Sequence, residues 1–399
     1  MSRKLRVLSV INELYFGGDE NRLLTMARSI DRSRFDLTVV TLKAPNPRLE
    51  SHFGTMRQHY ADAGVDVRDL GEGHPNEGLA LGSARRVMRA GAMFGRTARR
   101  VGRLVRDLEI DVIDAHLGPG NLVGVMAGVM TNTPRVVTTY HVEQWKPSWL
   151  WFGVHQWTLA MSDAIITDSD ACAAQIRRWM IRRNPNIPVI PNGVVPPQSS
   201  RTVAEMRAQF GLPLDPDVKV VGQVSTLLPT KGHMVMIDAA RTIHDRMPNT
   251  AFLLVGYVRE DASYKDRLEA HAAELGLSDC VRVVSYPGPI GDVWKVIDVH
   301  AHPTMLDSLP NAIIEGMSLG RPAVVTSVGG IPTLVEDGVT GLVIPPNDAA
   351  ALSDALLRVL SQPDYARTLG DAAQRRYLEN YTPQIMARRL EDTFAKVAR

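Results

Sequence analysis

The sequence predicts an α/β protein with two doubly wound domains, each built on a parallel sheet. Apolar runs of strand length alternate with helical patterns along the whole chain, which is typical of parallel sheets covered by helices on both faces. The chain of 399 residues is also too long for one ordinary core, and its 45% of hydrophobic residues is enough to fill two. Two domains of somewhat under 200 residues each are therefore expected.

The first domain is expected to end near residue 195. Its strands are predicted at residues 6–11, 36–42, 112–116, 135–139 and 164–168. The stretch VIPNGVVPP then concentrates proline and glycine at residues 189–197 and is followed by polar residues, as is typical of a domain boundary. We therefore predict an N-terminal domain at 1–195 and a C-terminal domain at 196–382.

The second domain repeats the alternation and is followed by one more helix. Its strands are predicted at residues 219–224, 251–255, 281–285, 299–302, 323–326 and 341–344. Segment 383–399 is expected to form an amphipathic helix, because its apolar residues share one side. Open parallel sheets bind ligands beyond the carboxyl ends of their strands, so the functional residues of both domains are expected there, around one cleft.

Composition narrows the class of protein. A net charge of +2 gives no strong field, so nucleic acid is not expected as a partner. Only two cysteines are present, which excludes a disulfide framework and fits a reducing compartment. The apolar run near the N-terminus is short and lacks a cleavage site, and no stretch approaches the roughly 20 apolar residues of a membrane span. A cytoplasmic protein, either soluble or peripheral on the inner face of the plasma membrane, is expected.

The most informative stretch runs from His302 to Asp348. Leu309 and Pro310 open an apolar helical pattern, so Asp307 or Ser308 is the expected N-cap. The backbone amides of loop 306–309, which includes Ser308 and Leu309, would suit a diphosphate at the helix start. Glu315 lies eight residues after Asp307, about two helical turns, and both carboxylates could bind sugar hydroxyls. An ordinary helix cap beside a strand explains the same residues.

Two further motifs follow strands and precede helices. Lys231 lies at the mouth of a predicted helix in GQVSTLLPTKGH and is the expected cation for a diphosphate, although a solvated lysine fits the same position. Gly17 and Gly18 follow the first strand. They lack the GxGxxG spacing, and no acidic residue ends the second strand, so a dinucleotide site is not indicated. An ordinary strand-to-helix turn is the other interpretation of this pair.

Taken together, these motifs resemble the donor-site signature of the GT-B glycosyltransferases of family 4, which are retaining enzymes. The resemblance rests on the order of a Gly-Gly loop, a TTYH strand end, an IPNGV hinge, a Lys-Gly turn and two carboxylates separated by seven residues before a strand and a second Gly-Gly turn. It extends over nearly the full chain. It implies two Rossmann-like domains facing a central cleft, with the C-terminal helix crossing back to the N-terminal domain.

The resemblance also implies roles in donor binding and catalysis. Lys231 would bind the diphosphate, and His141 would contact the donor sugar near its 6-hydroxyl. Glu315 would bind the ribose, and Asp307 the 3- and 4-hydroxyls of the sugar. The donor-binding C-terminal domain would thus supply most of the chemistry, with Lys231, Asp307 and His141 as the catalytic candidates.

The N-terminal domain would bind the acceptor. In the family the glycine pair, here Gly17 and Gly18, lies beneath the sugar diphosphate and helps to form the acceptor pocket. His116, Tyr140 and Trp145 are further acceptor-side candidates. A metal is not expected, because no His/Cys cluster has ligand spacing and helix amides with a lysine can replace a cation at the diphosphate.

Two positions depart from the family pattern. Asp307 stands where the family has glutamate and is shorter by one methylene. Gln223, also a donor-binding candidate, stands where the family usually has arginine, which leaves an amide in place of a second cation. Arg22 or Arg259 could substitute for that cation.

A basic helical region and a group of tryptophans suggest a membrane surface. Arginines interleave with apolar residues through 83–106, and five of the six tryptophans lie between Trp145 and Trp179. Contact with an anionic membrane or a lipid-linked acceptor would use such residues. A helix packed on the sheet with its arginines in solvent fits equally.

The resulting expectation is a metal-independent retaining glycosyltransferase. It would move a hexose from a nucleotide diphosphate sugar to a sugar or lipid-linked acceptor in cell-envelope or exopolysaccharide synthesis. A non-catalytic partner subunit stays open because of Gln223 and Asp307. A nucleotide-sugar epimerase on the same fold also stays open, with chemistry at His116 or Glu143.

Overall fold

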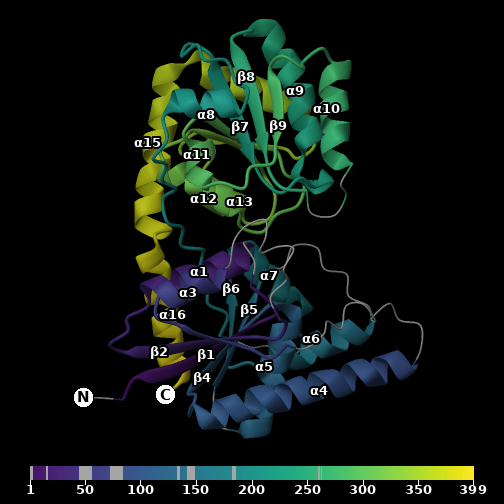
Figure 1. Cartoon of the computed structure of the whole chain (residues 1–399), viewed down its shortest axis with the longest axis vertical. Helices are drawn as coiled ribbons and strands as arrows, with labels where there is room; N and C mark the ends of the chain where they lie inside the picture. Colours follow the sequence, from purple (N-terminus) through teal and green to yellow (C-terminus); the bar gives the residue numbers. More distant parts are fainter. Residues whose placement is uncertain are drawn as a thin grey trace. The chain divides into compact units, whose positions relative to one another are not determined.

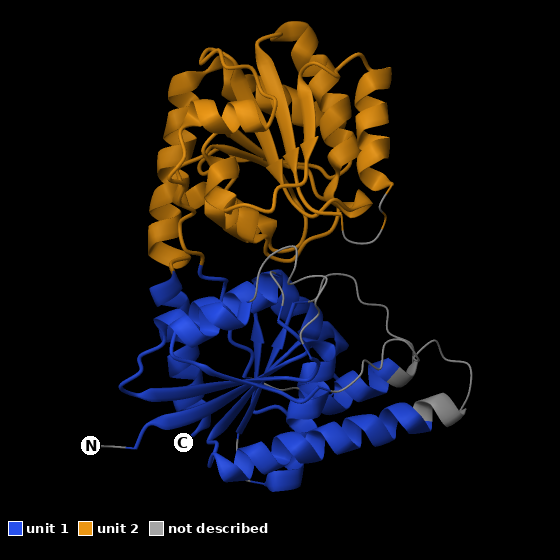
Figure 2. Ribbon diagram, viewed as in Figure 1, with its two compact units in different colours: residues 1–193, 383–399 blue, residues 194–382 orange. Residues whose placement is uncertain are grey.

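The computed structural model describes residues 3–14, 17–44, 56–71, 84–132, 135–141, 149–181, 186–258, 261 and 263–399. The chain forms two compact units (Figure 2). Unit 1 comprises residues 1–193 and 383–399, and unit 2 comprises residues 194–382. The division follows Gly193, two residues before the expected end of the first domain.

The sheet of unit 1 is parallel and has the strand order β3-β2-β1-β4-β5-β6. The strands are β1 (Leu5–Ile11), β2 (Phe35–Thr41), β3 (Asp66–Asp69), β4 (Val112–His116), β5 (Arg135–Tyr140) and β6 (Ala164–Thr167). The sequence analysis predicted five of these six strands and missed β3. This edge strand reads DVRD and buries none of its residues, so it lacks the apolar run used to recognise the others.

Helices cover both faces of this sheet (Figure 1). On one face lie α1 (Gly18–Ser29), α3 (Met56–Asp62) and α16 (Pro383–Val397), and on the other lie α4 (Ala84–Asp107) and α5 (Leu117–Thr131). Successive side chains of β1 point to opposite faces of the sheet, so Val7 packs with α1 and Leu8 packs with α5. At the β6 edge, α6 (Trp149–Met161) and α7 (Asp170–Trp179) pack on β5 and β6.

Unit 2 repeats this topology with the order β12-β11-β10-β7-β8-β9. Its parallel strands are β7 (Lys219–Val224), β8 (Thr250–Val255), β9 (Val281–Val284), β10 (Val299–His302), β11 (Ala323–Thr326) and β12 (Leu342–Ile344). From β7 the chain adds β8 and β9 on one side, and it then returns to add β10 on the other side of β7. The order of strands in unit 1 reverses in the same way between β1 and β4. Ligands of doubly wound sheets bind beyond the strand ends at such a reversal.

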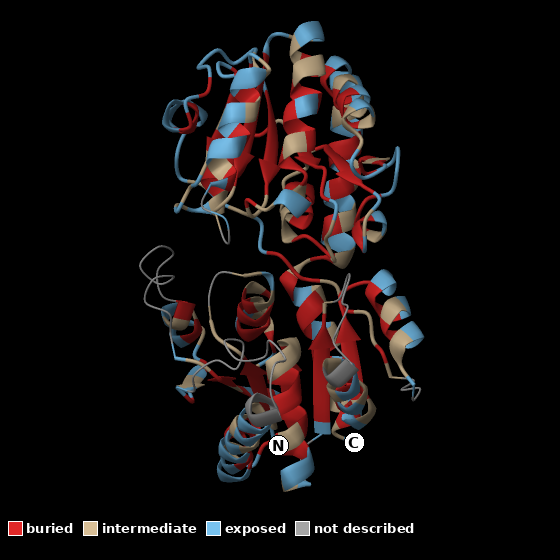
Figure 3. Cartoon of the chain, turned by 90° about the vertical axis from the view of Figure 1, so that its right-hand side faces the viewer, coloured by how far each residue is buried: buried red, intermediate tan, exposed pale blue. Residues whose placement is uncertain are grey.

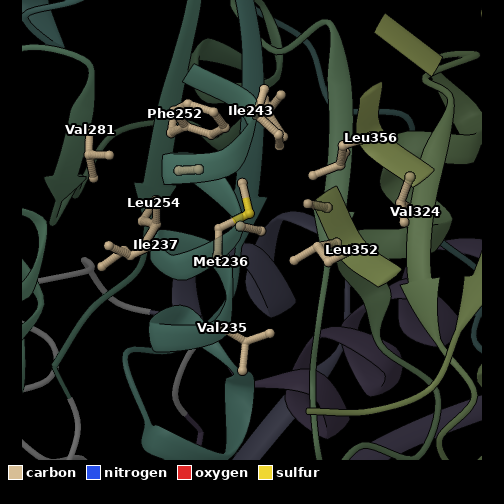
Figure 4. Packing of buried hydrophobic residues seen from close by; sticks show 14 of the residues in the cluster. Val235, Met236, Ile237, Ile243, Phe252, Leu254, Val281, Val324, Leu352 and Leu356 are labelled. Atoms are coloured by element: carbon tan, nitrogen blue, oxygen red, sulfur yellow. The ribbon is translucent and has the colours of Figure 1, made fainter. Parts of the chain in front are cut away.

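The core of unit 2 lies on both faces of its sheet. One face packs against α9 (His233–Arg246), α10 (Tyr264–Glu274) and α14 (Ala349–Ser361), where Met236, Phe252 and Leu356 lie in one cluster (Figure 4). The other face packs against α8 (Val203–Gln209), α11 (Ile290–Trp294), α12 (Asn311–Ser318), α13 (Ile331–Leu334) and α15 (Pro363–Asn380). Buried strands between half-exposed helices recur in both units (Figure 3).

The last helix, α16, belongs to unit 1 although the chain reaches it from unit 2. Met386, Leu390 and Phe394 lie in the same buried cluster as β1 and α1. The Glu391 carboxylate accepts hydrogen bonds from the Asp31 backbone N–H at 2.8 Å and from Arg34 at 3.2 Å. The predicted fold class, two Rossmann-like domains with a C-terminal helix that returns to the first, is therefore confirmed.

The basic helix α4 buries its apolar side within unit 1. Phe94, Val101 and Val105 lie in the cluster shared with α5, while Arg96 and Arg103 are exposed. This is the packed-helix interpretation, and it leaves little of the apolar stripe for a membrane surface. Among the residues that the structure describes, no helix combines the length and hydrophobicity that a membrane crossing requires.

Candidate active site

In unit 2, the loops after β7 and β10 meet at the reversal of the sheet. Gly232 has a φ of +73°, and a Cβ atom there would overlap the Pro303 carbonyl oxygen. Only glycine fits this conformation and this close approach. The short helix η2 (Pro229–Lys231) thereby places Lys231 beside the segment that carries Asp307.

Lys231 and Asp307 form the charged centre of this loop pair. The Lys231 Nζ lies 2.6 Å from Asp307 Oδ2 and donates to the Leu306 carbonyl oxygen at 3.2 Å. His302 Nε2 lies 3.1 Å from the same Asp307 oxygen. Burial alone would raise the pKa of Asp307, but the hydrogen bond to His302 and the charge of Lys231 outweigh it and lower this pKa. Asp307 is therefore ionised at neutral pH.

Helix α12 begins later than the sequence predicted. Its first residue is Asn311 and its N-cap is Pro310, with no side-chain capping bond. The prediction that Asp307 or Ser308 caps this helix is therefore wrong. Asp307 does not cap it because its carboxylate is held by Lys231 and His302. The Ser308 carbonyl accepts from the Gly330 N–H at 2.8 Å, and the Leu309 side chain is buried in the core. Leu309 can therefore offer a ligand only its backbone groups.

Glu315 lies on α12 and is held by Trp294 of α11. The Trp294 indole N–H donates to Glu315 Oε2 at 2.8 Å. Burial raises the pKa of Glu315, and the indole hydrogen bond opposes this rise. A Cβ on Gly316 would lie 3.1 Å from the Trp294 ring, so this glycine lets the indole pack against the helix. The carboxylate is thus anchored through one oxygen.

The side chain of Gln223 makes a different contact from the one expected. Its side chain is fully buried, and its amide N–H donates to the Lys231 carbonyl oxygen at 2.7 Å. The expected use of Gln223 as a diphosphate donor is not supported, because this amide already binds the backbone of the turn. Gln223 instead holds the turn that carries Lys231.

In unit 1, His141 follows β5 and lies between two carboxylates. Its Nδ1 is 2.8 Å from Asp168 Oδ2, and its Nε2 is 2.6 Å from Asp19 Oδ1. Burial alone would lower the pKa of His141, but Asp19 and Asp168 together raise it to about 10. The imidazole is therefore an imidazolium at neutral pH, hydrogen-bonded to Asp168 through Nδ1 and ion-paired with Asp19 on its Nε2 side.

Arg22, one substitute cation named above, is tied into the interior of unit 1. Its guanidinium donates to the Ile190 carbonyl oxygen and to Asn192 Oδ1, both at 2.8 Å. Burial lowers the pKa of Arg22, opposed by Asp168, Asp19 and Asp114. It balances the carboxylates at the strand ends. Arg259 and Glu143 lie outside the described residues.

The acceptor-side candidates fall into different environments. His116 is buried at the end of β4, with Nε2 2.7 Å from Asp114 Oδ2, and Leu117 after it has a φ of +62°. Such a conformation is strained for leucine. Tyr140 is buried in the core, its hydroxyl is 2.8 Å from the Thr158 hydroxyl, and burial raises its pKa to about 12. Tyr140 therefore packs inward, and Trp145 lies outside the described residues.

The glycine pair begins α1 at the β1 end of the reversal in unit 1. Gly17 is the N-cap, and a Cβ on Gly18 would meet no described atom within 4 Å. Within the described residues, the backbone at Gly18 is therefore open to close approach.

Sequence reasoning missed the partners that orient these groups. Asp168 directly follows β6, His302 ends β10 and Asp114 lies in β4, so the rule that strand ends share one edge could have found all three. Asp19 and Trp294 carried no such signal, since both lie in helices and not at strand ends. Among the described residues, no group of three or more His, Cys, Asp or Glu side chains could hold a metal ion.

Comparison with known protein families follows the same division. Residues 205–376 match the family model described as glycosyl transferases group 1. Residues 17–193 match the model of the glycosyl transferase 4-like domain. The two matches together span most of both units. The chain therefore belongs to the group 1, or family 4, glycosyltransferases of GT-B fold, and it is a glycosyltransferase.

Individual relatives are more distant. The chain is 28% identical to D-inositol 3-phosphate glycosyltransferase of Corynebacterium urealyticum over 308 residues, which cover 72% of this chain and 70% of that protein. A glycosyltransferase structure from Rickettsia africae matches with a TM-score of 0.83 at 15% identity, covering both chains completely. Anabaena HepE in complex with UDP matches with a TM-score of 0.79 at 21% identity over 98% of this chain and 100% of that one.

Proposed function

We propose that the chain is a retaining glycosyltransferase that moves a hexose from a nucleotide diphosphate sugar to a hydroxyl group of a sugar or lipid-linked acceptor. Such a reaction belongs to cell-envelope or exopolysaccharide synthesis on the cytoplasmic side of the membrane. The observation that carries this proposal is the Lys231–Asp307 contact of 2.6 Å at the reversal of the unit 2 sheet. It joins one cation for a diphosphate to one carboxylate for a sugar.

The ammonium has capacity for a ligand. Lys231 uses two of its three hydrogens on Asp307 and Leu306 and makes no further hydrogen bond to the part of the chain that the structure describes. A departing nucleoside diphosphate gains negative charge as the glycosidic bond breaks, so a fixed ammonium stabilises the transition state more than the ground state. Backbone amides at the start of α12 add partial positive charge.

The reaction needs no protein nucleophile. The bond between the anomeric carbon and the diphosphate oxygen breaks, and the acceptor oxygen bonds to that carbon on the same face. The acceptor proton passes to the departing diphosphate oxygen. Asp307 and Glu315 bind hydroxyls of the sugar and the ribose, and no metal is required because Lys231 and the helix amides supply the positive charge.

Donor and acceptor are inferred separately. HepE has also been solved with UDP-glucose, which makes UDP-glucose the first donor to test. The Corynebacterium relative is named for an inositol phosphate acceptor. In this chain, Asp19 and Asp168 flank His141, and the charges of His141 and Arg22 balance those of the two carboxylates. Carboxylates accept hydrogen bonds from hydroxyl groups, which supports an acceptor that presents hydroxyl groups there, and the balanced charge gives no preference for or against a phosphate.

Contact with a membrane surface would use α6 rather than α4. Phe152, Trp157 and Met161 of α6 are 37 to 39% exposed, and Ile181 is 78% exposed. The Gln156 side chain bonds the backbone of Trp179 and of Ile181 and thereby ties the end of α7 to α6. Arg177 and Arg178, near the end of α7, are exposed as well. Aromatic residues beside arginines suit an anionic headgroup layer or a lipid-linked acceptor.

The first test measures donor binding and nucleoside diphosphate release. Native protein is incubated with UDP-, GDP- and ADP-sugars, and the best donor is repeated with Lys231→Ala and with the partly exposed control Lys265→Ala. We expect Lys231→Ala to slow release by about 100- to 1,000-fold, the range for removing one transition-state donor. The control should retain native rates.

Other outcomes separate the alternatives. Binding without release, even with added sugar acceptors, would identify a non-catalytic partner subunit. Conversion of the donor into an isomer without an acceptor would identify an epimerase. No binding of any nucleotide sugar would overturn the proposed donor site.

A further inference from the structure

Strand β10 carries two histidines on the face that packs toward α11 and α12. Val299 and Ala301 point into the cluster on the opposite face of the sheet, whereas His300 and His302 alternate with them. The His300 ring contacts Trp294 with a centroid distance of 5.0 Å and His302 with one of 5.6 Å. Apolar residues would serve such a buried layer at less cost.

Only one polar contact of this pair is made to the described residues. Neither ring nitrogen of His300 has a hydrogen-bond partner there, and His302 Nδ1 has none. Burial, with a smaller effect of His302, holds the pKa of His300 well below its ordinary value. Unpaired buried polar atoms destabilise a fold. Of the four ring nitrogens of His300 and His302, the one with a partner among the described residues is His302 Nε2, which lies 3.1 Å from Asp307 Oδ2.

This contact determines which Asp307 oxygen faces a ligand. Lys231 in the turn after β7 and His302 at the end of β10 reach Oδ2 at 2.6 Å and 3.1 Å. Oδ1 makes no hydrogen bond within the described ranges. Two donors on one oxygen restrict rotation of the carboxylate about its Cβ–Cγ bond. Because aspartate reaches less far than glutamate, the orientation of the remaining oxygen matters more here.

We propose that His302 is a positioning residue that fixes the Asp307 carboxylate so that Oδ1 accepts a hydroxyl of the donor sugar. This inference rests on the proposed function, since it assigns Asp307 to a sugar. His302 does not touch the substrate. It acts through Asp307, so its loss should weaken recognition of the sugar and leave recognition of the nucleoside diphosphate largely intact.

Three variants test this assignment. His302→Leu removes the donor and keeps an apolar side chain in the layer. His302→Gln restores a donor, because the glutamine Nε2 reaches nearly as far as the imidazole Nε2. His300→Leu is the matched control, since it lies on the same strand and face, is equally buried and bonds no carboxylate. Thermal unfolding of each variant identifies any that fails to fold.

The measurement is calorimetric binding of UDP-glucose, GDP-mannose and ADP-glucose beside UDP, GDP and ADP. For the nucleotide sugar that native protein prefers, we expect His302→Leu to weaken binding by about 10- to 100-fold, the range for losing a hydrogen bond to a charged group. Binding of the matching nucleoside diphosphate should change less than about threefold. His302→Gln should recover most of the loss, and His300→Leu should bind like native protein.

Three results would overturn the assignment. One is native affinity for the sugar nucleotide in folded His302→Leu. Another is an equal loss for sugar nucleotide and diphosphate in both leucine variants, which would indicate a packing role only. In both cases the proposed function would stand if native protein binds and turns over a donor. Failure of native protein to bind any of the six ligands would instead remove the proposed function and this inference together.

Discussion

At the scale of single residues, His141 shows how neighbours determine a charge. Burial alone would favour its neutral form, yet the carboxylates of Asp19 and Asp168 lie beside its two ring nitrogens and raise its pKa to about 10. The same contacts lower the pKa of Asp19, against the effect of its burial. His141 is therefore a fixed cation at neutral pH and cannot act there as a general base.

This charge predicts a pH-dependent stability. Because the folded-state pKa of about 10 lies above the ordinary value of 6.5, the stabilisation from charged His141 is complete below pH 6.5 and is lost as the pH rises to 10. We expect Asp19→Asn to destabilise unit 1 by about 1–3 kcal/mol at pH 6.5, with the difference from native protein shrinking toward pH 10. Urea unfolding at pH 6.5, 8 and 10 measures it.

The exposed Asp66 provides the control for this prediction. It pairs with Arg68 on the surface, so Asp66→Asn should change the free energy of unfolding by less than about 1 kcal/mol at each pH. A destabilisation by Asp19→Asn that stays constant from pH 6.5 to pH 10 would contradict the proposed charge of His141.

At the scale of secondary-structure elements, α5 lies close to its sheet because of a glycine at every fourth position. A Cβ on Gly120 would lie 2.9 Å from the Val10 carbonyl oxygen, and one on Gly124 would lie 2.7 Å from the Ala115 Cβ. Gly128 continues this row against Val136. Residues four apart share a helix face, so the row forms one flat contact on β1, β4 and β5.

Substitution within this row should separate packing from helix propensity. Gly124→Ala should destabilise unit 1 by about 1–3 kcal/mol, because the added methyl group overpacks against β4. Gly95→Ala on the neighbouring α4 should stabilise it by about 0.5–1 kcal/mol, since a Cβ there meets no atom of the described residues within 4 Å. Denaturant midpoints of both variants measure the two effects. Equal shifts of the two denaturant midpoints in the same direction would show that the close packing of α5 on the sheet does not require glycine at position 124.

At the scale of the whole molecule, the chain completes unit 1 only with its last segment. Phe394 of α16 is fully buried against residues from the first strands and α1, more than 350 positions earlier in the sequence. Unit 1 therefore cannot form its full core until the chain has passed through unit 2.

A pair of substitutions on α16 tests this dependence. Phe394→Ala should destabilise unit 1 by about 3–5 kcal/mol, the range for truncating a buried phenylalanine. Asp392→Ala, on the exposed side of the same helix, should stay within about 0.5 kcal/mol of native protein. Hydrogen exchange should show faster opening of β1 and β2 in Phe394→Ala, with β7 and β8 unchanged. Equal loss of protection in both sheets would contradict the assignment of α16 to unit 1.

The sequence by itself determined the α/β class and eleven of the twelve strands, because runs of buried residues in parallel strands are local signals. It also indicated Lys231, Asp307, Glu315 and His141, because each lies beside a strand end or a helix start in a motif of fixed order. The half-exposed strand β3 was not predicted, because an edge strand can form without an apolar run. The start of α12 was misplaced because a cap depends on what else binds the capping side chain.

Only the tertiary structure decided the electrostatic partners. Asp19 of α1 meets His141 after β5, Gln223 of β7 holds the Lys231 turn, and His302 of β10 shares Asp307 with Lys231. It also decided that α4 buries its apolar side and that Tyr140 packs inward. The physical reason is that burial, pKa and hydrogen bonding depend on the atoms within a few ångströms in space, whereas sequence patterns report neighbours along the chain.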